Sequence, residues 1–104
     1  MEKFLFIYFG GMTATTPAAQ KKSMDAWMKW FSDMGKAVVD AGNPTVPGKE
    51  VSKAGTKKMT LTRPITGYTI VQADNMDTAV KMAKMSPIIA EGGKISIYTI
   101  TPVM

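Results

Sequence analysis

Residues 3–9 read KFLFIYF, a run of aromatic and branched side chains that ends at Gly10-Gly11. Aromatic and β-branched residues favour a β-strand, because they pack well on a pleated surface. Successive side chains of a strand point to opposite faces of its sheet. One face would therefore carry Phe4, Phe6 and Tyr8, and the other Leu5, Ile7 and Phe9. Since both faces are apolar, the sheet that contains this strand has to be covered on both sides.

A long helix is expected after this strand, because threonines that can cap a helix precede Pro17, which suits a first turn. We predict that it runs to about Ala41 and ends at Gly42, with Pro44 just beyond. Apolar residues form one stripe at helical spacing: Met24, Trp27, Met28, Phe31, Met34 and Val38. The opposite face alternates in charge and predicts contact with solvent: Lys22, Asp25, Lys29, Asp33, Lys36 and Asp40.

The rest of the chain predicts a weak hairpin, two strands and a second helix. Asp74 or Asn75 can cap that helix, and Ser86-Pro87 ends it. The expected elements are a hairpin of residues 49–53 and 57–62 around Ala54-Gly55, a strand over 66–73, a helix over 76–85 and, after Gly92-Gly93, a last strand over 94–101.

The order of strand, helix, two strands, helix and strand predicts a split β-α-β fold, in which two helices cover one face of an antiparallel sheet. With 104 residues, the chain is expected to form a single domain over 1–104. Two helices leave the other sheet face uncovered, although the first and last strands put apolar side chains there. A second copy of the chain is the simplest cover, so we predict a homodimer through the open sheet face.

Composition excludes several kinds of function. The chain has neither cysteine nor histidine, which removes disulfides, thiolate nucleophiles, a Ser-His type of triad and most zinc sites. No phosphate-loop pattern, dinucleotide fingerprint or carboxylate cluster for a hard metal occurs in the sequence, so we expect no cofactor and no metal. A lack of cysteine is compatible with a reducing compartment, and we predict a cytoplasmic protein.

The formal charge of +5 comes from twelve lysines and one arginine against eight acidic residues. The lysines are scattered, and a surface that follows phosphates would ordinarily draw on arginine as well. We therefore expect solubility rather than nucleic-acid binding to explain the charge. No apolar run approaches the roughly 20 residues of a membrane span, and the stretch 4–9 is shorter than the apolar region of a secretory signal.

Several segments together match the pattern of a known family. They are the opening strand with Gly10-Gly11, residues 37–44 (AVVDAGNP), residues 65–74 (ITGYTIVQAD), and the second helix followed by Ser86-Pro87, Gly92-Gly93 and a final strand. In their order and spacing the chain resembles the YCII-related (DGPF-type) family, whose members are dimeric α+β barrels with a ferredoxin-like fold. The resemblance implies that fold and a dimer for this chain.

The resemblance also implies where chemistry would lie, because the family's suggested activity rests on a histidine and an aspartate beside the sheet. Asp40 matches the acid. The histidine is missing, and Ile88 stands directly after Pro87, where many similar sequences carry histidine. The Asp-Gly-Pro-Phe motif is reduced here to Arg63-Pro64-Ile65. We therefore assign no catalytic residue, and whether the chain is an enzyme stays open.

Six residues are candidates for binding a small molecule: Tyr8, Trp30, Asp40, Asn43, Arg63 and Tyr68. The two tyrosines could offer hydroxyl groups to a ligand or simply pack, and Asn43 could bind a ligand or form a turn. Asp40 could line a pocket or pair with Lys36 in solvent, and Arg63 could hold an anion or be solvated.

The tryptophans differ in the role expected of them. Trp27 and Phe31 lie in the apolar stripe; with the ten methionines they could line an adaptable apolar pocket, but they are expected to be core residues. Trp30 lies at the edge of the stripe, and we expect it at a pocket rim or a subunit contact.

Three functions compete. The first is a small-molecule-binding dimer without established catalysis. The second is an enzyme that acts on small aromatic or carbonyl compounds through Asp40, a tyrosine or ordered water. The third is an RNA-binding module, which shares this strand order, but residues 67–71 lack the basic-glycine-aromatic run that such modules carry on their third strand. The first is our prediction.

Overall fold

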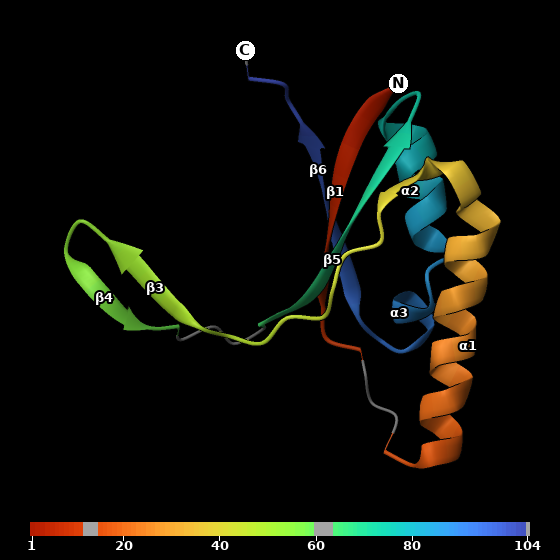
Figure 1. Ribbon diagram of the computed structural model, residues 1–104, viewed down its shortest axis with the longest axis horizontal. Helices are drawn as coiled ribbons and strands as arrows, with labels where there is room; N and C mark the ends of the chain where they lie inside the picture. Colours follow the sequence, from red (N-terminus) through yellow and green to blue (C-terminus); the bar gives the residue numbers. More distant parts are fainter. Residues whose placement is uncertain (12–14, 60–63, 104) are drawn as a thin grey trace.

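Four strands form one antiparallel sheet in the order β2-β5-β1-β6, and the helices cover one of its faces (Figure 1). The computed structural model describes residues 1–11, 15–59 and 64–103. Its elements are β1 (Glu2–Phe9), α1 (Pro17–Met34), the short 3-10 helix η1 (Gly35–Ala37), β2 (Val38–Asp40), β3 (Lys49–Ser52), β4 (Gly55–Lys58), β5 (Ile65–Ala73), α2 (Met76–Lys84), α3 (Pro87–Ala90) and β6 (Lys94–Ile100). The predicted ferredoxin-like α+β fold is confirmed.

The register of β1 with its neighbours fixes which residues form the core. Phe6 lies opposite Thr69 of β5 and Ile97 of β6, so all three point to the helix-covered face. Phe4, Phe6 and Val71 are completely buried there. The alternate residues of the same strands, such as Leu5 with its partners Ile70 and Tyr98, point to the open face. The expected alternation of β1 is therefore confirmed.

The prediction that the first helix continues to Ala41 is wrong. Gly35 adopts a left-handed backbone with φ of 53°, which ends α1 at Met34. After η1, the β-branched Val38 and Val39 enter the sheet as β2, where Val38 lies opposite Val71. Helical spacing alone cannot show this change, because Val38 continues the apolar period of the helix.

The hairpin around Ala54-Gly55 is confirmed over Lys49–Lys58, where Val51 lies opposite Thr56. It forms a separate two-stranded sheet and does not join the main one. Its expected continuation through residues 60–62 lies outside the described residues. The second strand of the main sheet is instead β2.

Side-chain caps start the later helices. The Asn75 Oδ1 atom accepts hydrogen bonds from the Thr78 backbone N at 2.9 Å and the Thr78 hydroxyl at 3.0 Å, so Asn75 and not Asp74 is the cap of α2. Ser86-Pro87 ends α2 as predicted, but it also begins the unpredicted α3, because the Ser86 hydroxyl accepts from the Ile88 N–H. α3 brings Ile88 into the core.

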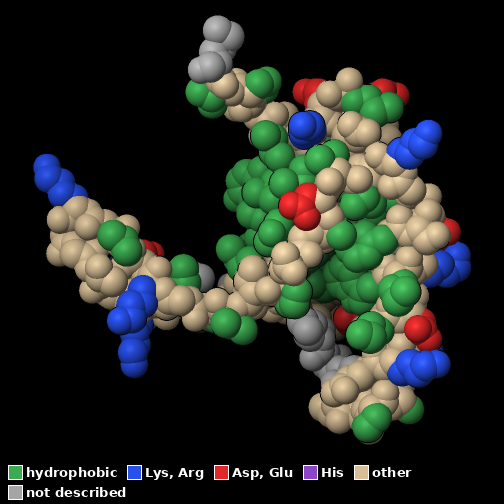
Figure 2. Space-filling view, viewed as in Figure 1, with side chains coloured by type: hydrophobic (Ala, Val, Ile, Leu, Met, Phe, Trp, Pro, Cys, Tyr) green, Lys and Arg blue, Asp and Glu red, His purple; other side chains and the backbone are tan. Residues whose placement is uncertain are grey.

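The open face of the sheet remains apolar. Tyr98 is 57% exposed there and Ile100, two residues along the same strand, is partly exposed, as is Ile65 opposite Phe9 at the start of β5. Figure 2 shows hydrophobic side chains gathered over the sheet on the side that faces the β3–β4 hairpin. Across the described part of the chain, no helix is long and apolar enough to cross a membrane.

Candidate functional site

A pocket of about 740 Å³ lies between α1, the loop that follows β2, and the first half of β5. This volume is within the range of roughly 300–1,000 Å³ that is common for small-molecule sites. Its wall includes Trp27 and Phe31 from α1, Tyr8 from β1, Thr69 from β5 and Ile88 from α3. Polar residues also line it, among them Gln20, Lys21, Ser23 and Asn43.

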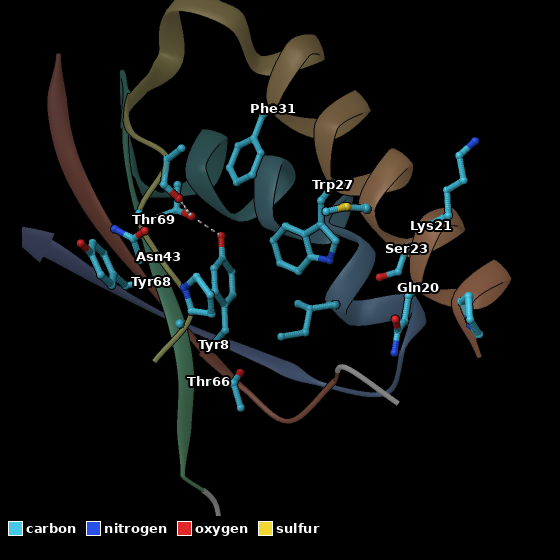
Figure 3. A pocket seen from close by; sticks show the side chains of 17 residues that line it. Tyr8, Gln20, Lys21, Ser23, Trp27, Phe31, Asn43, Thr66, Tyr68 and Thr69 are labelled. Atoms are coloured by element: carbon cyan, nitrogen blue, oxygen red, sulfur yellow. Dashed lines mark hydrogen bonds between the residues drawn. The ribbon is translucent and has the colours of Figure 1, made fainter. Parts of the chain in front are cut away.

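The wall is largely aromatic. Trp27 and Phe31 point from α1 toward Tyr8 and Thr69 (Figure 3). The Tyr8 ring meets the Trp27 ring edge to face, with 5.2 Å between centroids, and the Trp27 and Phe31 centroids are 6.0 Å apart. Such a wall can receive a flat, apolar molecule by stacking and edge contacts.

A short chain of hydrogen bonds forms the polar floor of the pocket. The Tyr8 hydroxyl donates to Thr69 Oγ1 at 2.6 Å, and Thr69 Oγ1 donates to the Ala41 carbonyl at 2.9 Å (Figure 3). The direction is fixed by chemistry, because a carbonyl can only accept and each hydroxyl has one hydrogen. Tyr8 Oη therefore keeps a lone pair, and not a proton, to offer a ligand.

Burial raises the pKa of Tyr8 from its ordinary value near 10 to about 12, and the hydrogen bond with Thr69 only partly opposes this effect. Tyr8 is thus a neutral phenol near physiological pH. It can accept a hydrogen bond there, but it is a poor general base.

Two glycines allow the loop after β2 to lie against β5. Gly42 has φ of 77°, and a Cβ atom there would lie 1.7 Å from the Tyr68 carbonyl oxygen. A Cβ on Gly67 would lie 3.1 Å from the Asn43 carbonyl oxygen and 3.4 Å from the Tyr8 ring. The close approach places Pro44 opposite Gly67 and holds Ala41 beside Thr69.

The structure brings three of the sequence candidates to this pocket, but not in the expected way. Tyr8, Asn43 and Tyr68 all line it. However, Tyr68 lies opposite Ile7 and so belongs to the other sheet face from Tyr8, and Figure 3 shows its hydroxyl pointing away from Tyr8. The Asn43 side chain is exposed, and its backbone oxygen accepts from the Tyr68 N–H at 3.4 Å. The two tyrosine hydroxyls do not converge.

Asp40 supports the loop and does not line the pocket. Its carboxylate accepts a hydrogen bond from the Gly42 N–H at 2.8 Å, and its side chain is exposed. No ion pair with Lys36 is found within residues 1–11, 15–59 and 64–103. Arg63 lies outside the described residues.

Trp30 lies in the core and not at the pocket rim, which corrects our expectation for it. It is 5% exposed, and its ring is stacked with the Phe6 ring, with 6.3 Å between the centroids. Its Nε1 donates a hydrogen bond to the Met82 carbonyl at 3.0 Å. Met24 and Met28, which we placed in the buried stripe, are 64% and 66% exposed. The face turned to the sheet is instead Trp27, Trp30, Phe31 and Met34, an equally good helical spacing.

Sequence reasoning missed the pocket residues Thr69 and Ile88 and assigned Trp27 and Phe31 to the core. Threonine in the middle of a strand carries no functional signal. Its hydrogen bond with Tyr8 follows only from the register of β1 with β5, in which Thr69 lies opposite Phe6 and Gly67 opposite Tyr8. Within the described residues, no group of three acidic side chains could hold a metal ion.

Comparison with known proteins gives a structural likeness alone. No protein-family model matches the chain, and no curated protein matches its sequence. Among solved structures, the chain is similar to 5-chloro-2-hydroxyhydroquinone dehydrochlorinase (TftG) from Burkholderia phenoliruptrix AC1100, determined with 2,5-dihydroxybenzoquinone. The likeness covers 93% of each chain with a TM-score of 0.54 and 14% sequence identity, so it supports the fold.

Proposed function

We propose that the protein binds a small, flat aromatic molecule that carries a hydroxyl group, and that Tyr8 Oη accepts the hydrogen of this group. The observation that carries the proposal is the one-way chain from Tyr8 through Thr69 to Ala41, set in a wall of aromatic rings. A hydroxyl donor satisfies the free lone pair of Tyr8, whereas a carboxylate or carbonyl oxygen would meet another acceptor. The ring of the ligand would lie against Trp27 and Phe31.

The similar solved structure is compatible with this ligand class. Its name refers to 5-chloro-2-hydroxyhydroquinone, and it was determined with 2,5-dihydroxybenzoquinone. Both molecules are small six-membered rings that carry oxygen atoms. With 14% identity the likeness supports the fold, and the choice of ligand rests on the pocket.

The second candidate function is an enzyme that acts on a small aromatic compound, and the observation in its favour is that the similar structure is named as a dehydrochlorinase. The pocket supplies little for catalysis. Tyr8 is neutral with its hydrogen committed, and Asp40 is bonded to Gly42 away from the pocket wall. We therefore propose binding without turnover as the leading function.

A homodimer through the open sheet face belongs to the same proposal. Its support is the apolar open face with Tyr98, Ile100 and Ile65. Membership of the YCII-related family is likewise proposed from the sequence pattern. A cytoplasmic location remains a prediction.

The binding proposal can be tested by titrating hydroquinone and 1,4-dimethoxybenzene into the protein and following tryptophan fluorescence. Hydroquinone should bind the wild type, and Tyr8→Phe should weaken it about tenfold, since one buried hydrogen bond contributes roughly 1 kcal/mol or more. Dimethoxybenzene cannot donate, so its affinity should be the same for both proteins. Tyr98→Phe, on the other sheet face, is the control.

Equal hydroquinone affinity in the wild type and Tyr8→Phe would contradict the role of Tyr8. Chromatography of the same mixtures after long incubation tests the second candidate. If the wild type converts hydroquinone to a product and Tyr8→Phe does not, the protein is an enzyme and not only a binding protein.

A further inference from the structure

The hairpin projects from the body as an arm, which we define as residues 46–59. Every residue of the arm is exposed, and the two strands of the arm pair only with each other. An isolated two-stranded hairpin is marginally stable in water, because it has no third layer on which to bury a face. A hairpin of this kind is therefore expected to pack on another surface.

The arm and the open sheet face lie on the same side of the molecule. In Figure 1 the helices cover one side of the sheet, and the arm extends on the other. The arm carries apolar residues as well as charge, and Val51 at its centre is 76% exposed. Any other molecule that covered the open face would therefore also lie beside the arm.

The exposed area fits a second copy of the chain. The accessible surface is 7646 Å², whereas a folded monomer of this mass exposes about 5,700 Å². The radius of gyration is 15.1 Å, against about 13 Å for a compact chain of this length. The excess is more than the roughly 800 Å² per partner that a standard interface buries.

Charge indicates which part of the second copy the arm would meet. The arm carries Lys49, Lys53, Lys57 and Lys58 against Glu50, which pairs with Lys57 at 3.2 Å. The carboxylates of Glu2, Asp74 and Asp77 are exposed at the other end of the sheet, where Glu2 lies opposite Ala73. Lys3 lies opposite Gln72, and Gln72 Nε2 donates to the Lys36 carbonyl at 3.0 Å, so these two lysines lie at the same end and offset two of the three charges. None of the three acids forms a salt bridge within the described part of the chain.

We propose that the arm of each subunit packs along its partner and that its lysines face Glu2, Asp74 and Asp77 of the partner subunit. The inference rests on the proposed homodimer. A two-fold axis in the plane of the interface, perpendicular to the strands, places the acidic end of one sheet over the arm-bearing end of the other. Such an interface is self-complementary, because each arm meets the same surface on its partner.

The test is sedimentation analysis of the full chain over a range of concentrations at low salt. Lys53→Glu/Lys58→Glu should weaken dimerisation about tenfold or more, because several attractive pairs become repulsive and symmetry doubles each change. Asp74→Lys/Asp77→Lys should weaken it similarly. The four changes together should restore the dimer, and 0.5 M salt should reduce all of these effects.

Lys22→Glu/Lys29→Glu is the matched control, because it changes the net charge equally on exposed residues of α1, away from the end of the sheet that carries Glu2 and Asp74. If the arm variants dimerise no more weakly than this control, or if the four changes fail to restore the dimer, the arm inference is overturned.

Tyr98→Lys separates this inference from the proposed dimer. If Tyr98→Lys breaks the dimer and the arm variants do not, only the arm inference fails. If the wild type is a monomer at all concentrations, both fail, and the arm would have to fit a different partner.

Discussion

The two faces of the sheet are made by the same strands, yet they have different surroundings. In β1, Phe4, Phe6 and Tyr8 pack in the helix-covered core, and Tyr8 also lines the pocket, whereas Leu5 and Ile7 lie on a face that no helix covers. The covered face combines a buried core with the pocket. The open face also carries apolar side chains, but no helix covers it. The comparison teaches that one alternating strand can form a helix-covered core on one face and leave apolar side chains uncovered on the other.

The largest expected effect contrasts neighbouring residues of β1. Phe6→Ala should lower the free energy of unfolding by about 3–5 kcal/mol, because Phe6 is completely buried against Trp30 and its loss leaves a cavity. In dilute protein, Leu5→Ala should lower the free energy of unfolding less than Phe6→Ala does. The loss should grow as the protein concentration rises, since the face that carries Leu5 would be covered only in the dimer. Urea denaturation at two protein concentrations measures both. A concentration-independent cost for Leu5→Ala would break the comparison.

The next effect contrasts two glycines in loops. Gly42→Ala should destabilise the protein by about 2–3 kcal/mol, because the new Cβ would lie 1.7 Å from the Tyr68 carbonyl and the residue would be held at φ of 77°. It should also weaken hydroquinone binding, since the loop carries Ala41 and Asn43. Gly48→Ala is the control, with nothing within 4 Å of its Cβ. Equal unfolding curves for the two variants would show that the loop can move away from β5 without cost.

The sequence predicted the sheet better than the site for physical reasons. Alternation in residues 3–9 depends on the two-residue period of a strand and needs no knowledge of partners. The end of α1 was misplaced because Val38 satisfies the helical period, and the backbone choice at Gly35 is invisible in that pattern. Trp27 was expected in the core and Trp30 at a pocket rim, whereas Trp30 is buried and Trp27 lines the pocket; this error has a similar cause. Positions 27, 30 and 31 all fit one helix face, and only docking on β1 decides which ring is buried.

The pocket was only partly predicted, because its residues come from segments that are distant in the sequence. Tyr8 and Asn43 were candidates as side chains with polar groups near the expected sheet. Thr69 was not a candidate, since its role depends on its hydrogen bonds with Tyr8 at 2.6 Å and with the Ala41 carbonyl at 2.9 Å. A chain of hydrogen bonds among three segments is a property of the tertiary structure, and local pattern cannot predict it.

The smallest expected effect tests the covered face through pH. Tyr8 has a pKa raised to about 12 in the folded protein, against about 10 when unfolded. Below pH 10 it is neutral in both states and its contribution is fully present. Between pH 10 and 12 the unfolded state ionises more readily, so stability falls as pH rises, by at most about 2–3 kcal/mol from this group. Urea denaturation of the wild type and Tyr8→Phe across this window measures the difference between their slopes. The Tyr8→Phe curve should be flatter, whereas Tyr98→Phe should keep the contribution of Tyr8, and identical slopes in the wild type and Tyr8→Phe would mean that the Tyr8 hydroxyl is open to water in solution.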